Sequence, residues 1–525
     1  MEANVQAEVH QLIIFIPGPG MGHIVSAVEV GKLILNRETR LSITFLLIND
    51  PQTQKYTNTL HSNENPRLQF INLPEIDTQT SSTSDRTSKP PPLVAAENID
   101  RHKPLVREAV LAISKSKTRV AGFIVDMFCL SMIDVANEFG IPIYTFFTSS
   151  AAFLSLKLFF QSLTDEHNQD ITEFKDSDQE FLIPGFVNPV PAKVLPSTML
   201  DKNGGSELVM STARKIRQTK GIFINTFQEL ESTAIESLSD CNRKIPPIYP
   251  IGPVINLKTE SKYSEDEIIR WLDKQPSSSV VFLCFGSQGS FSEAQIKHLA
   301  AALESSGHRF LWSIRNRTSR DGITDYASPD EILPEGFRKR TSGVGKVIGW
   351  APQAAVLSHA AVGGFVSHCG WNSILESLWY GVPMAAWPMY AEQQVNAFQM
   401  VVELGMAVEI RMDYRDEMAD DDRNVVRSEE IERAINRLMA NEDVKEMRKK
   451  VKDMKEKSLR ALMEGGGENV NRLTLAWSLG RALESRRWIF ATVCKNLESN
   501  GYEDVDIEKL SSNGGAKAEG CIQVG

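Results

Sequence analysis

The sequence has few cysteines, no surplus of positive charge and no long apolar run. Its 525 residues include six cysteines, without a CxxC pair or a histidine at metal-ligand spacing. A chain of this length does not need disulfides to stabilise its core, so we expect a reducing compartment. With 57 Lys and Arg against 67 Asp and Glu, the formal net charge is −10, which argues against a nucleic-acid partner.

No segment is long and apolar enough to span a membrane, because Asp126 and Asp134 interrupt the best candidate at 120–136. The first ten residues are acidic rather than basic, and the apolar stretch after them ends at Pro17, which is too short for a signal-peptide core. With 42% hydrophobic and 24% charged residues the composition is that of a soluble globular protein. We therefore expect a cytoplasmic protein without a membrane span, and we expect it to be a monomer.

Short β-branched runs alternate with helical stretches in both halves of the chain. The predicted strands of the first half are 12–16, 42–48, 68–73 and 120–125, and those of the second half include 280–285, 310–314, 346–348, 364–367 and 384–386. Continuous apolar strands, each followed by a helix, indicate a parallel sheet covered on both faces. The run 245–264 has four prolines followed by polar residues, which predicts a linker near 252–264. The sequence thus predicts an α/β protein with two doubly wound domains facing each other across a cleft.

The first predicted strand leads into a glycine-rich turn, 17–23, which ends at His23 and continues into a helix. A dinucleotide fingerprint, GxGxxG, would require a third glycine where His23 stands. Asp126 ends an apolar strand whose carboxyl edge should lie near this turn, and its carboxylate would orient His23 and stabilise the charged imidazole. The alternatives are a solvent-facing His23 and an Asp126 that only ends its strand or caps the helix after it.

Two further glycine-rich turns follow predicted strands in the second half. The turn 285–290 could hold a phosphate, but it lacks the lysine of a P-loop, which argues against nucleoside-triphosphate hydrolysis. In the segment 363–373, His368, Asn372 and Ser373 come where a helix N-terminus would hold a diphosphate, and we expect His368 to add local positive potential. Ser373 and Glu376 also match a capping box, which is the purely structural alternative.

The block from Trp350 to Gln393 resembles the 44-residue signature of plant UDP-dependent glycosyltransferases that act on secondary metabolites. The segments FIPGPGMGH, IVDMFC, YTFFTSSAA and FLCFGS resemble other blocks of this family in the same order, and the similarity extends from about residue 10 to about residue 465. Within the family, the chain most resembles the branch that glucosylates flavonoids and triterpenoids. The resemblance implies the GT-B fold, with two Rossmann-like domains, and an inverting transfer from UDP-glucose that requires no cofactor and no metal.

The resemblance also implies roles for individual residues. His23 would be the general base, assisted by Asp126. The acceptor would be a small apolar plant metabolite with a hydroxyl group, bound by segments that include 78–92 and 147–160. The donor would contact the following residues: Trp350 and Ala351 at the uracil, Gln353 and Glu376 at the ribose, Ser287, His368, Asn372 and Ser373 at the diphosphate, and Thr148, Trp371, Glu392 and Gln393 at the sugar.

The resulting domain organisation is an acceptor-binding domain at 1–251, the linker at 252–264 and a UDP-sugar-binding domain at 265–470. A helix at 471–484 would cross back to the first domain, and 485–525 would be an atypical, disordered tail. Two alternatives remain open at this point. One is an NAD-dependent oxidoreductase that uses the loop GPGMGH as a fingerprint and Asp50 as the ribose ligand. The other is a non-catalytic homologue that only binds a UDP-sugar.

Overall fold

The structure is a computed structural model, which describes residues 11–48, 53–60, 65–76, 90–115, 119–256, 263–318, 322–326, 328–415, 425–440 and 444–462. Most of the segment 78–92, the expected helix 471–484, the tail 485–525 and Asp50 lie outside these residues. Within them, no helix is sufficiently long and apolar to cross a membrane.

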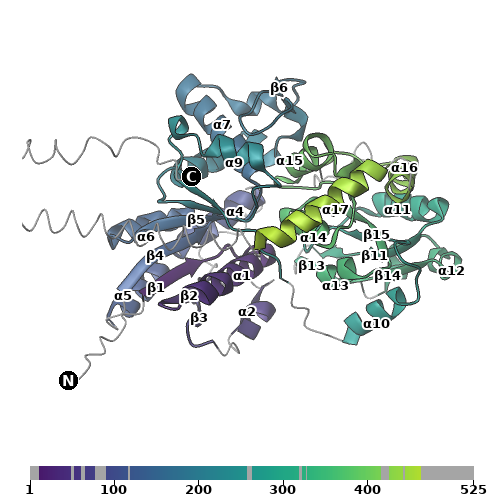
Figure 1. The fold of residues 1–525 in the computed structure, drawn as a ribbon, viewed down its shortest axis with the longest axis horizontal. Coiled ribbons are helices and arrows are strands. Elements are labelled where there is room, and N and C mark those ends of the chain that lie inside the picture. The colour runs from purple at the N-terminus through teal and green to yellow at the C-terminus, as the bar shows by residue number, and fades with distance from the viewer. Residues whose placement is uncertain are drawn as a thin grey trace, which may run out of the picture.

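A seven-stranded, fully parallel sheet forms the centre of the first domain, on the left of Figure 1. Its strand order is β3-β2-β1-β4-β5-β8-β9, and every neighbouring pair runs parallel. The strands are β1 (Gln11–Ile16), β2 (Leu41–Leu47), β3 (Leu68–Asn72), β4 (Arg119–Asp126), β5 (Ile143–Phe147), β8 (Ile222–Ile224) and β9 (Ile248–Pro250). The helices are α1 (Met21–Arg37), α2 (Gln54–Leu60), α4 (Pro91–Arg101), α5 (Lys103–Lys115), α6 (Ile133–Glu138), α7 (Ala151–His167), α8 (Gly205–Ile216) and α9 (Ser232–Leu238).

A six-stranded parallel sheet of order β14-β11-β10-β15-β16-β17 forms the centre of the second domain, on the right of Figure 1. Its strands are β10 (Val280–Cys284), β11 (Arg309–Ser313), β14 (Gly345–Ile348), β15 (Val362–Ser367), β16 (Met384–Ala386) and β17 (Ala407–Glu409). Its helices are α10 (Tyr263–Leu272), α11 (Glu293–Ser306), α12 (Phe337–Arg340), α13 (Gln353–Ser358), α14 (Trp371–Tyr380), α15 (Gln393–Phe398), α16 (Ser428–Met439) and α17 (Lys445–Arg460). Two short antiparallel pairs lie outside the main sheets: β6 (Glu180–Phe181) with β7 (Val190–Pro191), and β12 (Asn316–Thr318) with β13 (Gly322–Thr324).

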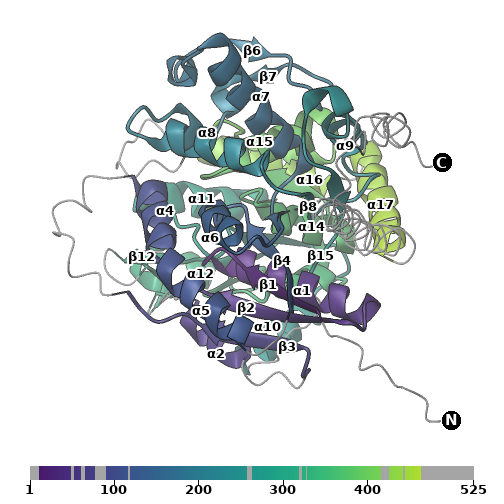
Figure 2. The ribbon, with the colours of Figure 1, turned by 90° about the vertical axis from the view of Figure 1, so that its left-hand side faces the viewer.

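Each central strand is apolar throughout because both of its faces are covered. In β1, Ile13 and Phe15 pack into the core shared with α1, whereas Ile14 and Ile16 pack into the core on the opposite face, with α5 and α6. Figure 2 shows α4, α5 and α6 on the side of this sheet that faces the viewer. Successive residues of a strand point to opposite faces, so an uninterrupted apolar run fits a sheet with helices on both sides.

The predicted strands agree with the observed ones to within one or two residues, but several other details differ. The first helix begins at Met21, so His23 lies in its first turn. The helical segment after β4 is divided into a 3-10 turn, Leu130–Met132, and α6. The strands β5, β8, β9 and β17 were not predicted. They are three to five residues long, and so short a run carries too little periodicity to identify a strand consistently.

The chain returns to the first domain after α17, which packs on α14 (Figure 1). Just beyond this helix, the guanidinium of Arg37, at the end of α1, donates to the carbonyl of Leu462 over 3.4 Å. The two domains are therefore in contact at the end of the described chain.

Candidate active site

His23 and Asp126 meet at the carboxyl edge of the first sheet. Asp126 is the last residue of β4 and is fully buried, and its Oδ2 lies 2.8 Å from Nδ1 of His23. A Cβ atom on Gly18 would lie 2.8 Å from Oδ1 of Asp126, so only glycine lets the turn pass this close to the pair. Oδ1 also accepts from the backbone N–H of Phe128, and this local turn contact accompanies the contact with His23.

This environment raises the pKa of His23 above its ordinary value of 6.5. Burial lowers the pKa, but the charge of Asp126, its hydrogen bond and the more distant charge of Glu392 outweigh this effect. Because Nδ1 faces the carboxylate, we assign the proton to Nδ1 and the free lone pair to Nε2. His23 can therefore accept a proton at Nε2 while Asp126 stabilises the resulting cation.

Thr148, which the family resemblance places at the sugar, also lies in this cluster. Its Oγ1 is 2.9 Å from Nδ1 of His23 and 3.4 Å from Oδ2 of Asp126. The ring of Phe128, which is half exposed, lies 4.8 Å from the imidazole. The histidine thus has polar partners at Nδ1 and an accessible aromatic surface beside its ring.

The expected diphosphate site lies in two turns of the second domain, which follow β10 and β15. A Cβ atom on Gly286, at φ +74°, would lie 2.6 Å from Nε2 of His368, so the glycine makes room for the buried imidazole. Ser287 is partly buried in the same turn. Cys369, next to His368, has a φ of +62°, which is unusual for a residue with a side chain and is typical of functional sites.

His368 does not supply the positive potential that we expected from the sequence. Burial lowers its pKa to about 4, so the imidazole is neutral at pH 7 in the free protein. Its Nδ1 is buried without a hydrogen-bond partner among the described residues. His368 can therefore donate a hydrogen bond to an anion, whereas the positive potential comes from the N-terminus of α14.

Gln353, Ser373 and Glu376 form a hydrogen-bonded cluster between α13 and α14. Nε2 of Gln353 donates to Oγ of Ser373 over 2.8 Å and to Oε2 of Glu376 over 2.7 Å. The capping-box alternative is wrong, because the N-cap of α14 is Gly370 and no side chain caps the helix. Burial raises the pKa of Glu376 to about 7, with the hydrogen bond from Gln353 acting in the opposite direction. A carboxylate held in this way can accept hydrogen bonds from the hydroxyl groups of a ligand.

Trp350 and Ala351 come just before this cluster. The side chain of Trp350 is exposed, and the guanidinium carbon of Arg315 lies 5.0 Å from the centre of its ring. One aromatic face is thus covered by a cation, and the exposed remainder can stack on a planar group. Ala351 is buried against the core of the second domain, which leaves its backbone as the part suited to binding.

Asn372 and Trp371 join the first turn of α14 to the first domain. Nδ2 of Asn372 donates to the carbonyl of Gly22 over 3.1 Å, and Oγ of Ser26 donates to its Oδ1 over 3.3 Å. The indole N–H of Trp371 donates to the carbonyl of Asn225 over 2.7 Å. The Trp371 side chain is buried, so only its backbone remains for the expected contact with a sugar.

Glu392 and Gln393 lie at the start of α15, directly after Ala391, whose φ is +56°. Oε1 of Glu392 accepts from Oγ of Ser149 over 3.0 Å, which connects it to the chain beside Thr148. Oε1 of Gln393 accepts the N–H groups of Met389 and Tyr390, so its carbonyl holds the turn. The expected donor site thus includes contacts between the two domains.

Sequence reasoning missed the residues that hold α7 against the second domain. Both carboxylate oxygens of the buried Glu231 accept backbone N–H groups at the start of α7, from Ala151 and Ala152, and Gln399 donates to the same carboxylate. Oγ of Ser150 donates to Asn396. A glutamate far along the chain from the helix it caps has no local pattern, so only the fold could reveal this contact.

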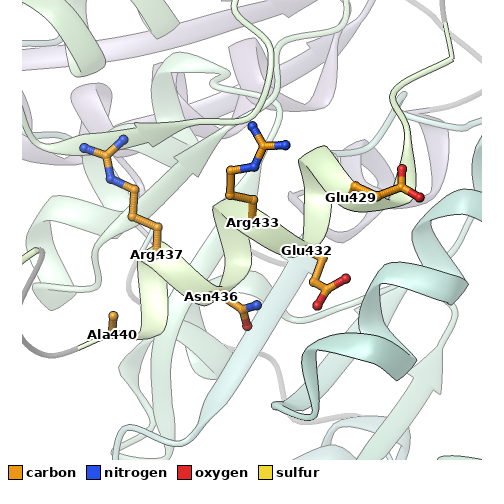
Figure 3. A pocket seen from close by; sticks show the side chains of 6 residues that line it. All are labelled: Glu429, Glu432, Arg433, Asn436, Arg437 and Ala440. Atoms are coloured by element: carbon orange, nitrogen blue, oxygen red, sulfur yellow. The ribbon is translucent and has the colours of Figure 1, made fainter.

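Neither a metal centre nor the main surface hollow belongs to this site. Within the described ranges, no group of three or more His, Cys, Asp or Glu residues could hold a metal ion. A surface hollow of about 620 Å³ lies along α16, and Figure 3 shows that its lining side chains project from this helix and from Ala440, directly after it. It contains none of the expected site residues, so we assign it no role.

Comparisons with known proteins identify the family. A model of the family "UDP-glucoronosyl and UDP-glucosyl transferase" matches residues 227–453. The chain is 52% identical over 461 residues to UDP-glycosyltransferase 71E1 of Stevia rebaudiana, covering 86% of this chain and 95% of that protein. It is 51% identical over 458 residues to anthocyanidin 3-O-glucosyltransferase 1 of Manihot esculenta, covering 85% and 97%.

Solved structures are similar over the same range. The Medicago truncatula protein UGT71G1, complexed with UDP-glucose, matches with a TM-score of 0.78 and 42% identity, covering 89% of this chain and 98% of that one. A transferase from Siraitia grosvenorii, in complex with UDP, matches with a TM-score of 0.77 and 43% identity, covering 89% and 99%. This similarity includes both domains and confirms the GT-B architecture, and the chain therefore belongs to the plant UDP-glycosyltransferase family.

Proposed function

We propose that this enzyme transfers glucose from UDP-glucose, with inversion, to a hydroxyl group of a small apolar plant metabolite such as a flavonoid, another phenolic compound or a triterpenoid. The observation that carries the proposal is the 2.8 Å contact between His23 of α1 and Asp126 of β4. Asn372, in the first turn of α14, contacts the carbonyl of Gly22 and so joins this site to the second domain. Two related proteins support the donor and the substrate class, since one is an anthocyanidin glucosyltransferase and the structure of the other contains UDP-glucose.

His23 acts as the general base. A neutral hydroxyl is a poor nucleophile, so Nε2 of His23 removes its proton while the oxygen attacks the anomeric carbon. The new carbon–oxygen bond forms on the side of the anomeric carbon opposite UDP. The bond from this carbon to the diphosphate oxygen breaks, and UDP leaves with the electron pair. Asp126 stabilises the imidazolium formed in this step, and Thr148 keeps the ring oriented.

The second domain stabilises the leaving group. Negative charge grows on the diphosphate, and backbone N–H groups at the start of α14 face it with the positive end of the helix. Ser287, His368, Asn372 and Ser373 add hydrogen-bond donors around this helix end. His368 contributes as a neutral donor, because its pKa of about 4 keeps it uncharged.

The remaining residues hold the nucleotide and the sugar. Trp350 stacks on the uracil, the backbone of Ala351 bonds its edge, and Gln353 and Glu376 hold the ribose hydroxyls. Glu392, Gln393 and the backbone of Trp371 bind the sugar. The base and the leaving-group site belong to different domains, so we propose that catalysis requires domain closure, with 252–264 as the hinge.

The alternatives have weaker support. Membership of the UDP-glycosyltransferase family does not support an NAD-dependent oxidoreductase. A non-catalytic homologue would not need the paired His23 and Asp126. Independence of metals, the cytoplasmic location and the monomeric state remain predictions.

Incubation with UDP-glucose and a panel of flavonoids, simple phenolics and triterpenes tests the proposal, with and without EDTA. We expect UDP release and a glucoside whose anomeric proton has the large coupling constant of the β configuration. Chelation should leave the rate unchanged. An α-configured product, or no UDP release with any acceptor although UDP-glucose binds, would overturn the proposal.

A further inference from the structure

A single lysine lies inside the otherwise apolar helix α7. Lys157 is only 6% exposed, and its neighbours along the chain are Leu156 and Leu158. Lysine is seldom buried to this extent without an ionic partner. In the part of the chain that the structure describes, its Nζ has no hydrogen-bond acceptor and no ion-pair partner. Nζ is also not fully enclosed, unlike the buried polar atoms that lack a partner. The small exposed area of Lys157 therefore includes the ammonium group.

Two observations place this group near the catalytic site. Ser150, the N-cap of α7, comes two helical turns before Lys157 and donates to Asn396 of the second domain. Lys157 interacts electrostatically with Glu392 and with Asp126. Neither carboxylate is within ion-pair distance of it, and each has another partner, Ser149 for Glu392 and His23 for Asp126. The ammonium thus lies near the site while remaining unpaired.

A cation that is almost wholly buried and has no ion-pair partner is unfavourable, and burial here does not neutralise it. Burial lowers the pKa of Lys157 to about 8, and the charges of Glu392 and Asp126 oppose this shift. The charged form therefore still predominates at pH 7. A bound anion would compensate the charge that the fold leaves uncompensated.

We propose that Lys157 determines acceptor specificity by binding a carboxylate group of the acceptor whose hydroxyl group lies at His23. The inference rests on the proposed glucosyl transfer and names a chemical class of acceptor for it. Two helical turns, about 10 Å along the axis, separate Lys157 from the start of α7 beside Thr148. An acceptor with its hydroxyl and its carboxylate at opposite ends fits this separation.

The test compares 4-hydroxycinnamate with its methyl ester at pH 7 and saturating UDP-glucose, with formation of the phenolic glucoside as the readout. The wild-type enzyme should prefer the acid in kcat/KM. Lys157→Met should reduce kcat/KM for the acid about 10- to 100-fold, mainly through KM, and abolish the preference. Lys175→Met removes an exposed lysine of the same domain and should keep the preference. Lys157→Gln serves as a second neutral variant if Lys157→Met does not fold.

Calorimetric binding of 4-hydroxycinnamate to the complex with UDP gives a readout that does not depend on turnover. We expect the wild type to bind the acid more tightly than the ester, and Lys157→Met to bind both equally. The proposal would be overturned if the wild type bound and used the acid and the ester equally well. It would also be overturned if both neutral variants still preferred the acid. An increase in KM for UDP-glucose with both acceptors would also overturn it, because Lys157 would then act on Glu392 and the sugar. If the enzyme glucosylates another acceptor of the panel but neither of these two, the proposed function stands and the proposal for Lys157 fails. If no acceptor at all is glucosylated although UDP-glucose binds, the proposed function fails, and calorimetry still decides the role of Lys157.

Discussion

The central residue is His23, whose basicity depends on a carboxylate 103 positions away in the sequence. Asp126 is fully buried at the end of β4, and its charge and hydrogen bond raise the pKa of His23 against the effect of burial. A higher pKa makes the neutral imidazole a stronger base, at the expense of a smaller neutral fraction at low pH. The pH profile of the enzyme should therefore report this one contact.

Asp126→Asn should move the acidic limb of the kcat/KM profile to lower pH while reducing the rate. In the wild type, the neutral base becomes populated as pH rises through a pKa above 6.5, so activity should rise through that range. Without the carboxylate, only the charge of Glu392 still opposes the effect of burial, so the pKa of His23 falls. We expect kcat/KM at the plateau to fall by about 10²–10⁴-fold. Asp134→Asn, which alters an exposed ion pair with Lys103, is the matched control and should leave the profile unchanged. An acidic limb that stays in place in Asp126→Asn would refute the assignment.

Glu376 should make UDP-glucose binding pH-dependent. Its pKa of about 7 in the free protein is raised by burial, and ribose hydroxyls donating to the carboxylate would favour the ionised form. Binding should release protons near neutral pH, and the affinity should increase about 3- to 10-fold from pH 6 to pH 8. Calorimetry in buffers of different ionisation enthalpy measures both quantities. Glu376→Gln should bind more weakly with no such dependence, whereas proton release that persists in this variant would exclude Glu376 as its source.

At the scale of elements, the site is formed by turns that follow parallel strands. The turns after β1, β10 and β15 contain the glycines and histidines that the sequence singled out, and α1 and α14 begin directly after two of them. The strands and these turns could be predicted because apolar runs, glycines and helix starts are local patterns. The φ of +62° at Cys369 and of +56° at Ala391 could not be predicted, since tertiary contacts impose these conformations on residues that do not favour them.

Gly286→Ala should weaken nucleotide binding by displacing His368. The new Cβ would lie 2.6 Å from Nε2 of His368, and a φ of +74° would cost an alanine about 1–2 kcal/mol. We expect UDP affinity to fall about tenfold and the melting temperature to decrease. Gly343→Ala is the matched control, because a Cβ there meets nothing within 4 Å. Wild-type affinity in Gly286→Ala would show that His368 does not need its present position.

At the scale of the whole molecule, the active site exists only where the two domains meet. Asn372 contacts Gly22, Trp371 contacts Asn225, and Glu392 contacts Ser149, so each expected donor residue of this group is also a contact with the first domain. From the sequence, the two-domain fold could be predicted, and the family resemblance supplied the expected site residues, whose roles are still predictions. The direction of individual side chains could not, and the enclosed indole of Trp371 and the contact of Thr148 with His23 are the clearest examples.

Lys157 illustrates the same limit. A lysine in a run of leucine and phenylalanine is visible in the sequence, and it was included only in a segment expected to line an apolar pocket. Helical periodicity alone does not tell whether such a residue points to solvent or to the interior. Its burial and its electrostatic interaction with Asp126 and Glu392 depend on how α7 packs between the two domains.

The most direct test of the account is UDP release from UDP-glucose by His23→Ala, measured with a phenolic acceptor that the wild type uses. We predict a decrease of about 10²–10⁴-fold, because the acceptor hydroxyl loses its base. The affinity for UDP should remain nearly unchanged, since the nucleotide contacts belong to the second domain. Wild-type turnover in His23→Ala, with UDP still bound, would contradict the assignment of His23 as the base and with it the proposed mechanism.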